Sequence, residues 1–455
     1  MRRGLVAAIA AAFALTAAPA FAFAGDWPVY GHDLANTRDG GADGPSAAAA
    51  GSLKQDWKFS SDHGDFTGTP VIAGGVLVAG TNMGRAYALE ASTGKLLWSR
   101  DLGQPINGSA AIDLAAPGGA MAFVPIAQQG DPQLAALSLA DGGVRWRAPL
   151  STQPSSANAD VFGSPTFWHG TVYIGTSGPN GDGSTARGSV VALNEATGAR
   201  RWISYTVPPG HDGGAVWSTP ALDSASGALY VGTGNAYHQP AADTTDAILA
   251  LSAASGRVLG HFQATPDDTF AADNPLGPDA DFGASPNLLR SPTGAALVGE
   301  GQKSGTYWAL DRGSLRPVWH TSIGPSAPIG GILGSTAYDG ARIYGTDAAD
   351  GQVWALGSGG SQAWSSVDPS TLDFAPVAVA NGVLYTIDPS GALVARNAAT
   401  GAPLTRQPLG SPSFGGVSVA GSRVFVAVGT GPPPGGQDGS RGAIVAFGAA
   451  PAASG

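Results

Sequence analysis

Gly68-Thr69-Pro70 opens a unit of sequence that continues through Val76-Leu77-Val78, Arg85-Ala86-Tyr87-Ala88-Leu89 and Thr93-Gly94-Lys95 to Trp98. The unit combines a small-residue start, an aliphatic strand, a short Ala-Leu strand, a Thr-Gly turn and a strand with a tryptophan. Related units follow at a spacing of about 40–60 residues, and no unit can bury all its apolar surface alone. This repeat predicts an all-β fold, an eight-bladed β-propeller whose four-stranded blades surround a central channel.

The blade count comes from the recurrence of the unit. Its Ala-Leu strand and tryptophan return as Gly188–Leu193 with Trp202, as Tyr307–Leu310 with Trp319, and as Gln352–Leu356 with Trp364. The expected blade starts lie near Gly68, Gly108, Gly163, Trp217, Phe282, Gly331, Phe374 and Phe414. The chain therefore contains eight blade starts and no sustained helical period from Leu53 to Phe447.

The last blade lacks an outer strand of its own. It ends in Gly442–Phe447 with no tryptophan strand after it, whereas Ser52–Phe59 reads as an isolated strand that contains Trp57. Pairing these two segments would close the ring and remove two open sheet edges. We therefore expect the first and last strands to share one blade.

The recurring tryptophans have a structural explanation. A flat indole buries a large apolar area, and its N–H can reach a carbonyl of the next blade. We expect this docking role for six of them, which are Trp57, Trp98, Trp146, Trp202, Trp319 and Trp364.

Composition excludes several functions. Only 12% of the 455 residues are charged and the net charge is -10, which argues against a nucleic-acid partner because phosphates require clustered Lys and Arg. The seven histidines show no paired metal spacing, and no Gly-Xaa-Ser-Xaa-Gly nucleophile motif is present. Zinc hydrolases and serine hydrolases are therefore set aside.

The first residues predict export. Arg2 and Arg3 precede an apolar stretch from Leu5 to Ala18, and Ala22-Phe23-Ala24 forms a cleavage site. This pattern indicates a removable signal peptide rather than a membrane span, and it leaves Sec and Tat export both open. The expected location is the periplasm or the medium. Cysteine is absent, so we expect no lipid anchor, no disulfide and no covalent haem.

The expected domain organisation has four parts. They are a signal peptide at residues 1–24, an N-terminal extension at 25–51, the propeller at 52–448 and a flexible tail at 449–455. Within the extension, the Ala- and Gly-rich segment 40–51 is expected to form an exposed loop.

Several motifs give the chain a family resemblance. They are Trp27–Arg38, Arg187–Leu193, Val216–Pro220, Leu229–Asn235, Asp281–Pro286 and Gly301–Gly305. With these motifs the chain resembles the pyrroloquinoline quinone (PQQ) dehydrogenases, the eight-bladed quinoproteins. The opening motif resembles their polyvinyl-alcohol dehydrogenase branch, here without a cytochrome c domain. The resemblance covers nearly the whole mature chain.

The resemblance implies a site in the central channel. Trp217 matches the tryptophan that stacks under the quinone, Lys303 a basic residue at the quinone oxygens, and Ser177 a contact of a cofactor carboxylate. Asn235 matches a calcium ligand, since amide oxygens suit this hard cation. Asp281 matches the catalytic base, which also touches the calcium and takes the alcohol proton while the quinone takes hydride.

Each of these residues also has a plain structural explanation. Trp217 could pack as a core side chain, and Asn235 could occupy an ordinary turn. Asp281 could be a solvated carboxylate in the acidic loop 267–281, and Lys303 could be exposed at the start of a strand. These alternatives stay open on the sequence alone.

The chain departs from its relatives at three places that face the cofactor. Asn180 stands where they have a calcium-binding glutamate, which lowers the charge of the site, although Asp182 could substitute. Residues 183–186 replace the two adjacent cysteines that cap the quinone. Gly330–Ser335 replaces a stretch that supplies a glutamate and a tryptophan. Both PQQ and Ca²⁺ are therefore implied by a site that has been partly altered.

Two functions follow as expectations. The first is an exported PQQ- and Ca²⁺-dependent dehydrogenase that oxidises a small or polymeric alcohol and passes electrons to an external acceptor such as a separate cytochrome c. The second is a non-catalytic propeller that serves as a binding or assembly scaffold. A propeller that binds another small ligand in the same channel is a third possibility.

Overall fold

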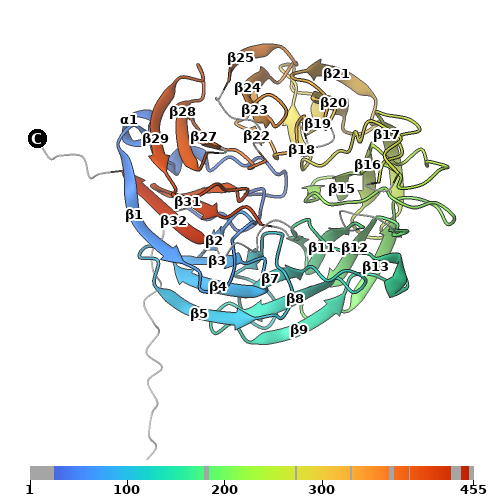
Figure 1. Cartoon of the computed structure of the whole chain (residues 1–455), viewed down its shortest axis with the longest axis horizontal. Coiled ribbons are helices and arrows are strands. Elements are labelled where there is room, and N and C mark those ends of the chain that lie inside the picture. The colour runs from blue at the N-terminus through green and yellow to red at the C-terminus, as the bar shows by residue number, and fades with distance from the viewer. Residues whose placement is uncertain are drawn as a thin grey trace, which may run out of the picture.

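The computed structural model describes residues 25–178, 184–271, 274–327, 330–367, 374–388, 390–431 and 442–449. Eight four-stranded antiparallel sheets stand around a central axis, as Figure 1 shows. The predicted eight-bladed propeller is confirmed. The described helical segments are short and comprise α1 (Ala47–Ala50) and the 3₁₀ turns η1 (Gly41–Asp43) and η2 (Ser155–Ala157).

Within each blade the strands run outward from the axis. The innermost strands are β2 (Val71–Ala73), β6 (Ala111–Asp113), β10 (Thr166–Trp168), β14 (Ala221–Asp223), β18 (Asn287–Arg290), β22 (Ala337–Tyr338), β26 (Ala378–Ala380) and β30 (Val417–Ala420). The second strands are β3 (Val76–Gly80), β7 (Met121–Ile126), β11 (Thr171–Thr176), β15 (Ala228–Gly232), β19 (Ala296–Gly301), β23 (Arg342–Asp347), β27 (Val383–Asp388) and β31 (Arg423–Val428). The predicted blade starts lie three to six residues before the innermost strands.

The remaining strands complete the blades. The third strands are β4 (Arg85–Glu90), β8 (Gln133–Ser138), β12 (Ser189–Asn194), β16 (Ala247–Ser252), β20 (Thr306–Asp311), β24 (Gln352–Gly357), β28 (Ala392–Asn397) and β32 (Ala443–Ala449). The outer strands are β5 (Leu96–Asp101), β9 (Val144–Pro149), β13 (Arg200–Tyr205), β17 (Val258–Gln263), β21 (Pro317–Ser322), β25 (Gln362–Val367), β29 (Pro403–Pro408) and β1 (Leu53–Ser60).

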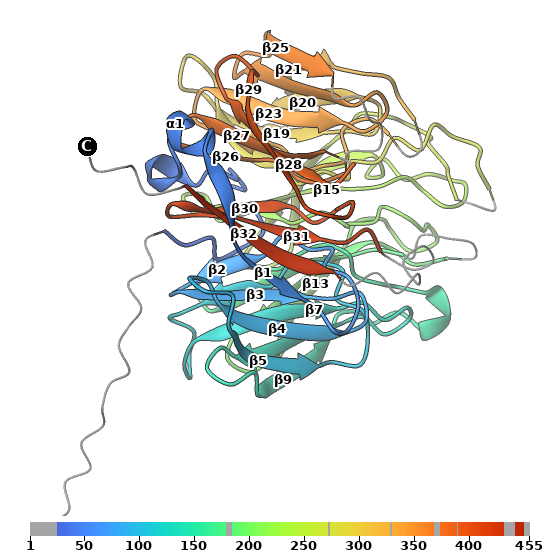
Figure 2. The ribbon, with the colours of Figure 1, turned by 60° about the vertical axis from the view of Figure 1, so that its left-hand side comes forward.

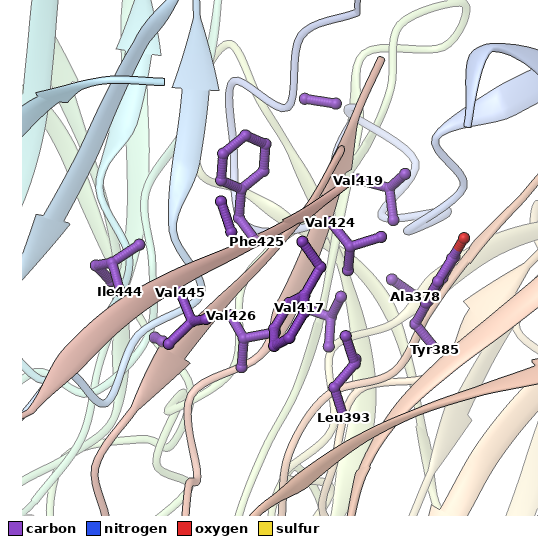
Figure 3. Close-up of a cluster of buried hydrophobic side chains, with 14 of the residues drawn as sticks. Ala378, Tyr385, Leu393, Val417, Val419, Val424, Phe425, Val426, Ile444 and Val445 are labelled. Carbon is purple, nitrogen blue, oxygen red and sulfur yellow. The ribbon is translucent and has the colours of Figure 1, made fainter. Parts of the chain in front are cut away.

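The closing blade joins the two ends of the described chain. Its strand order is β1-β32-β31-β30, and β1 pairs antiparallel with β32 from Leu53–Ala449 to Ser60–Ala443. The closure predicted from the isolated strand is confirmed. Apolar side chains such as Val417, Val424 and Val426 pack beside β27 and β28 of the preceding blade (Figure 3).

All six predicted docking tryptophans donate their indole N–H to a main-chain oxygen of the next blade. The pairs are Trp57–Ala91 (3.2 Å), Trp98–Leu139 (2.8 Å), Trp146–Glu195 (2.9 Å), Trp202–Ala253 (3.1 Å), Trp319–Ser358 (3.2 Å) and Trp364–Ala398 (3.0 Å). Each indole also lies against a turn glycine of that blade, as Trp57 does against Gly94. Glycine is required at Gly94 because its φ is +72° and a Cβ would lie 2.5 Å from the indole.

The fourth blade uses a different pair at this interface. Gly260 takes the tryptophan position opposite Ala250, and Leu315 takes the glycine position of the next turn at φ 54°. The carbonyl of Arg312, which an indole would otherwise reach, accepts the hydroxyl of Tyr230 at 2.8 Å. The fourth blade therefore contributes the small residue of this contact and the fifth blade the large one, the reverse of the tryptophan–glycine pairs. The hydroxyl of Tyr230 takes over the hydrogen bond that an indole N–H makes elsewhere.

At the hub, which is the region around the central axis, hydroxyl side chains just before the innermost strands accept hydrogen bonds from neighbouring blades. The main-chain N–H of Ser109 donates to Ser164 Oγ (2.9 Å), that of Ser164 to Thr219 Oγ1 (3.3 Å), that of Thr219 to Ser285 Oγ (2.9 Å) and that of Ser285 to Ser335 Oγ (2.8 Å). Neighbouring blades are thereby linked to one another around the central axis.

The N-terminal segment 27–38 crosses the hub on one side of these hydroxyl groups. Its carbonyls accept N–H groups of five innermost strands through the pairs Trp27–Ile72, Pro28–Ile112, Leu34–Leu222, Ala35–Leu288 and Thr37–Tyr338. The carbonyl of Arg38 likewise accepts from Val379 in β26. Each partner lies within its innermost strand, about three residues beyond the hydroxyl position. The segment therefore covers one end of the channel.

The exposed loop predicted at residues 40–51 is only partly correct. Part of this segment forms η1 and α1, and Ala50 is fully buried beside the closing blade. Figure 2 shows α1 on one side of the ring, while long yellow-green loops around β15 project on the other side. The two faces of the propeller therefore carry different structures.

Candidate active site at the hub

The predicted site residues lie at the end of the hub opposite the N-terminal segment. Trp217 and Asp281 come shortly before the innermost strands β14 and β18, whereas Ser177, Asn235 and Lys303 follow the second strands β11, β15 and β19. Because the first and second strands of a blade are antiparallel, the start of one and the end of the other meet at the same face.

Asp281 is the centre of the site and is held from two directions. Its Oδ1 accepts the main-chain N–H of Asn235 at 2.7 Å, and its Oδ2 lies 2.9 Å from Lys303 Nζ. The main-chain N–H of Lys303 also donates to the carbonyl of Asp281 at 3.0 Å. Asp281 is only 8% exposed, so the reading as a solvated loop carboxylate is wrong.

Lys303 is buried and bridges two carboxylates. Its Nζ lies 2.8 Å from Asp279 Oδ1 as well as 2.9 Å from Asp281 Oδ2. Burial opposes its positive charge most strongly, but the attraction of Asp281 and Asp279 outweighs burial and raises the pKa of Lys303. The reading as an exposed lysine is therefore wrong, and the side chain presents a stable cation to the site.

Trp217 differs from the six docking tryptophans. Its side chain is half-buried, and no hydrogen bond of its indole N–H is found among the described residues. One edge of the ring packs on the backbone of Gly283, where a Cβ would lie 1.9 Å from Cη2 of the indole. Lys303 Nζ lies 5.7 Å from the ring centroid. The arrangement places a flat apolar surface next to a cation.

Asn235 is buried with its amide group oriented. Its Nδ2 donates to the carbonyls of Ala236 and Phe270, both at 2.6 Å, and the residue is 5% exposed. Both amide hydrogens are thus used by the backbone, which leaves the Oδ1 atom to accept or to ligate. A fixed amide oxygen of this kind suits a hard cation. An asparagine in an ordinary turn would not need both of its amide hydrogens to be bonded in this way.

A second group of carboxyls surrounds Asp281 and was not singled out from the sequence. Asp279 and Asp268 are buried, and the pKa of Asp279 is raised to about 7, chiefly by burial and then by repulsion from Asp281. Burial is also the main cause that raises the pKa of Asp268, and burial with repulsion from Asp281 raises that of Asp246 well above its usual range. Four carboxyl groups therefore compete for the single ammonium of Lys303.

Ser177 lies farther from this group but on the same face. Its backbone pairs with Asp160, and its Oγ is buried with no hydrogen-bond partner within the described ranges. The N–H of the next residue, Gly178, donates to the hydroxyl of Tyr237 at 3.1 Å. Burial raises the pKa of Tyr237, with a second contribution from the charge of Asp281, which connects the Ser177 segment to the Asp281 group.

The three departures from the quinoprotein pattern have different outcomes. Asn180 and Asp182 lie outside the described residues. In the segment that replaces the paired cysteines, Ser184 is buried, and its Oγ bonds the carbonyl of Ala157 at 3.3 Å. In the third segment, Ile332 packs against Gly301, and Ser335 joins the hydroxyl groups of the hub. These two segments therefore support the fold locally.

The site contains side-chain oxygens of the kind that bind a calcium ion. Asn235 Oδ1 and the carboxylate of Asp281 are oxygen donors of the type that calcium prefers. In the part of the chain that the structure describes, no group of three His, Cys, Asp or Glu side chains is arranged to hold a metal. Asn235 and Asp281 therefore fit the donor chemistry that a calcium site requires.

No helix among the described residues is long and apolar enough to cross a bilayer.

Solved structures with similar folds include alcohol-oxidising dehydrogenases and BamB. The chain aligns with quinohemoprotein alcohol dehydrogenase from Comamonas testosteroni at a TM-score of 0.76 and 19% identity, covering 93% of this chain and 80% of that one. A europium-containing methanol dehydrogenase aligns at 0.76 and 17% identity, covering 93% and 98%. BamB from Moraxella catarrhalis aligns at 0.60 and 15% identity, covering 87% and 97%. At these identities the likeness concerns the fold alone.

Curated relatives are dehydrogenases. The chain is 30% identical over 329 residues to a polyvinylalcohol dehydrogenase of Sphingopyxis sp. (strain 113P3), a match that covers 64% of this chain and 50% of the relative. It is 28% identical over 352 residues to a polyvinylalcohol dehydrogenase of Pseudomonas sp., covering 70% and 54%. The chain thus spans about half the length of these relatives.

A family model accounts for most of the chain. The model described as outer membrane protein assembly factor BamB matches residues 46–321 and 349–440. These ranges include all eight blades at least in part, together with every described residue of the Asp281 group. The chain therefore belongs to this family of PQQ-like β-propellers.

Proposed function

We propose that the hub face formed by Trp217, Asn235, Asp281 and Lys303 binds PQQ with a calcium ion and oxidises an alcohol. The single observation that carries this proposal is the fixed position of Asp281. One of its oxygens is held by the N–H of Asn235 and the other by the ammonium of Lys303, directly beside the half-buried ring of Trp217. A base, a cation and a flat aromatic surface are thus assembled at one end of a channel.

Each residue has a distinct proposed role. Trp217 offers the surface on which a planar quinone stacks, because a large apolar area is buried there at low entropic cost. Lys303 donates hydrogen bonds to quinone oxygens, and Ser177 offers its free Oγ to a cofactor carboxylate. Asn235, Asp281 and Asn180 are the proposed calcium ligands.

When bound, the quinone would accept a hydride from the alcohol carbon, which carries both electrons of the oxidation, and the calcium ion would polarise the quinone carbonyl. The chain itself supplies the base. Asp281 takes the hydroxyl proton of the alcohol, and its two hydrogen-bonding partners keep its carboxylate at a constant position during this transfer. The N-terminal segment covers the other end of the hub, so the alcohol enters from the face that carries Asp281.

The electron acceptor and the place of action belong to the same proposal. Cysteine is absent, so the haem-binding motif CxxCH does not occur in this sequence, and electrons would pass to a separate acceptor such as a cytochrome c. The signal sequence expected at residues 1–24 places the reaction in the periplasm or outside the cell.

The experiment is a titration of the purified apoprotein with PQQ in the presence and absence of Ca²⁺. Quinone absorbance reports binding, and a redox dye with primary, secondary and polymeric alcohols reports turnover. We expect PQQ to bind and at least one alcohol to be oxidised. A folded protein that binds no PQQ at millimolar Ca²⁺ would show that the proposed function is wrong.

A second candidate function is a non-catalytic assembly scaffold. The observation that favours it is the description of the matching family model, outer membrane protein assembly factor BamB. A scaffold, however, has no need for the buried Asp281–Lys303–Asp279 arrangement, whose carboxylates are costly to desolvate. A folded protein that binds neither PQQ nor calcium would favour this second function.

A further inference from the structure

Asp246 occupies a backbone position that glycine takes in other blades. The carbonyl before the third strand accepts an N–H from just beyond the outer strand, in the pairs Gly84–Leu102, Gly305–Ile323, Gly391–Leu409 and Asp246–Ala264. The three glycines have φ between +75° and +90°, and Asp246 has φ 48°. A residue with a Cβ is strained there, so the presence of aspartate calls for a compensating role.

The carboxyl group of Asp246 is also buried without a partner. The residue has no exposed surface, and neither of its oxygens has a hydrogen-bond partner within the described part of the chain. Burial of such a group is unfavourable unless it is hydrogen-bonded or bound to a cation. The fold alone gives no reason to prefer aspartate over glycine at this position.

Asp246 is connected directly to the segment that holds the site. Its N–H donates to the carbonyl of Gly234 at 3.0 Å, and Gly234 precedes Asn235. Gly234 lies so close to Asp281 that a Cβ there would be 2.8 Å from Asp281 Oδ1. After burial, the charges that act most on Asp246 are those of Asp281 and Asp268.

The balance of charge around Asp246 favours a cation. Asp246, Asp268, Asp279 and Asp281 interact electrostatically, and Lys303 is the basic side chain of the described residues that acts on Asp246, Asp268 and Asp279. One oxygen of Asp268 also has no partner within the described ranges, although the residue is 1% exposed. Three of the four carboxyls thus have no cationic charge to balance them in this group.

We propose that Asp246 supplies a carboxylate ligand to the cation of the site, in place of the glutamate that relatives have where this chain has Asn180. The inference rests on the proposed function, because the cation is the one assigned to Asn235 and Asp281. No trio of acidic or histidine side chains is preformed as a metal site within the described residues. Ligation by Asp246 would therefore require its side chain to turn toward Asp281.

The test compares Ca²⁺ binding to the parent protein, Asp246→Asn and Asp246→Gly by calorimetry and by sensitised Tb³⁺ luminescence. Both variants are expected to lose at least tenfold in affinity. Asp246→Gly should also melt at a higher temperature than the metal-free parent, because glycine suits the positive φ and removes the buried carboxyl. Both variants binding Ca²⁺ as tightly as the parent would overturn the inference, as would a parent that binds no Ca²⁺.

Glu300→Gln provides a matched control. Glu300 is likewise fully buried with two oxygens that lack partners in the described chain, but its pKa is raised by burial rather than by the charge of Asp281. This variant should bind Ca²⁺ as the parent does. An equal loss in Glu300→Gln would show that any buried carboxyl has the effect and would overturn the inference.

Failure of the inference and failure of the proposed function give different results. Ca²⁺ binding that depends on Asp246, in a protein that takes up no PQQ, would retain the inference and reject the proposed function. PQQ uptake, Ca²⁺ affinity and Ca²⁺-dependent alcohol oxidation at the parent level in both Asp246 variants would retain the function and reject the inference.

Discussion

Asp281 and Lys303 are joined twice, once through their side chains at 2.9 Å and once through the main chain at 3.0 Å. The side-chain contact alone could form in many conformations of two loops. The added backbone bond ties the segment before β18 to the turn after β19, so the carboxylate and the ammonium keep one relative position. A preorganised pair of this kind is what proton abstraction beside a quinone requires.

Asp281→Asn tests the proposed base. Its amide oxygen can still accept the N–H of Asn235, but the amide cannot take a proton from an alcohol. We expect turnover to fall about 10²–10⁴-fold, while PQQ affinity changes little. Dye-linked oxidation and quinone absorbance measure the two effects, with Asp311→Asn at the end of β20 as the control. Oxidation at the parent rate would remove Asp281 from the mechanism.

Trp217 and Trp146 should respond in opposite ways to replacement by leucine. Trp217 is half-buried beside Lys303, so Trp217→Leu should weaken PQQ binding about tenfold or more, which is about 1.4 kcal/mol, with little change in melting temperature. Trp146 is buried and bonds the carbonyl of Glu195. Trp146→Leu should cost about 3 kcal/mol of stability and leave PQQ affinity unchanged. The same response in both variants would contradict the distinction between stacking and docking tryptophans.

The exchanged pair Gly260 and Leu315 predicts a compensated double variant. Gly260→Trp alone would collide with Leu315 and should destabilise the fold by about 1–3 kcal/mol. Leu315→Gly alone removes a buried side chain and should lower the free energy of unfolding by about 2–5 kcal/mol. Part of this loss is offset because glycine relieves the backbone strain at the positive φ of this position. Together they restore the indole–glycine contact of the other blades. Chemical denaturation of all four proteins should give a favourable coupling energy of at least about 1 kcal/mol. Strictly additive effects would show that the two sites are independent.

Buried carboxyls predict an unusual pH dependence for the apoprotein. Burial raises the pKa of Asp160 and of Asp347 to about 6 in each case. Between about pH 4 and pH 6 the folded protein therefore holds protons that the unfolded chain has released, so stability falls as the pH rises through this window. We expect the apoprotein to unfold at a higher temperature at pH 5 than at pH 7.5, by an amount equivalent to about 2–4 kcal/mol.

Thermal scans in buffers of constant ionic strength measure this dependence. Asp160→Asn and Asp347→Asn should each reduce the decrease in melting temperature between pH 5 and pH 7.5, because the replaced group no longer releases a proton. A melting temperature that rises between pH 5 and pH 7.5 would contradict the prediction.

The repeat made the architecture readable from the sequence. Each blade has its strand and turn signals within one short stretch, six blades add a docking tryptophan, and the pairing of β1 with β32 followed from two incomplete units. The alanine of each Ala-Leu phrase faces the tryptophan across the outer strand pair, as Ala88 faces Trp98, and a bulge follows it. This geometry explains why the phrase recurs so regularly.

The site was only partly predictable for physical reasons. Trp217, Asn235, Asp281 and Lys303 come together because they flank strand ends that the repeat already located. Asp246 was missed because its proximity to Asp281 depends on how a long loop after β15 folds back. Aligning the turns before the third strands would have revealed it as an aspartate in a glycine position. Gly260 and Leu315 were missed since neither is unusual until the two are seen in contact.

The shared last blade has a consequence for biogenesis. While the polypeptide is being synthesised, β1 emerges among the first strands, but its partner β32 arrives only with the final segment. Until then the nascent ring exposes two unpaired strand edges. Such edges favour aggregation, so the incomplete ring would benefit from chaperones that hold it until the blade closes. A circular permutant cut between two other blades, with the present ends joined by a short linker, would complete this blade early and should reach its native state faster.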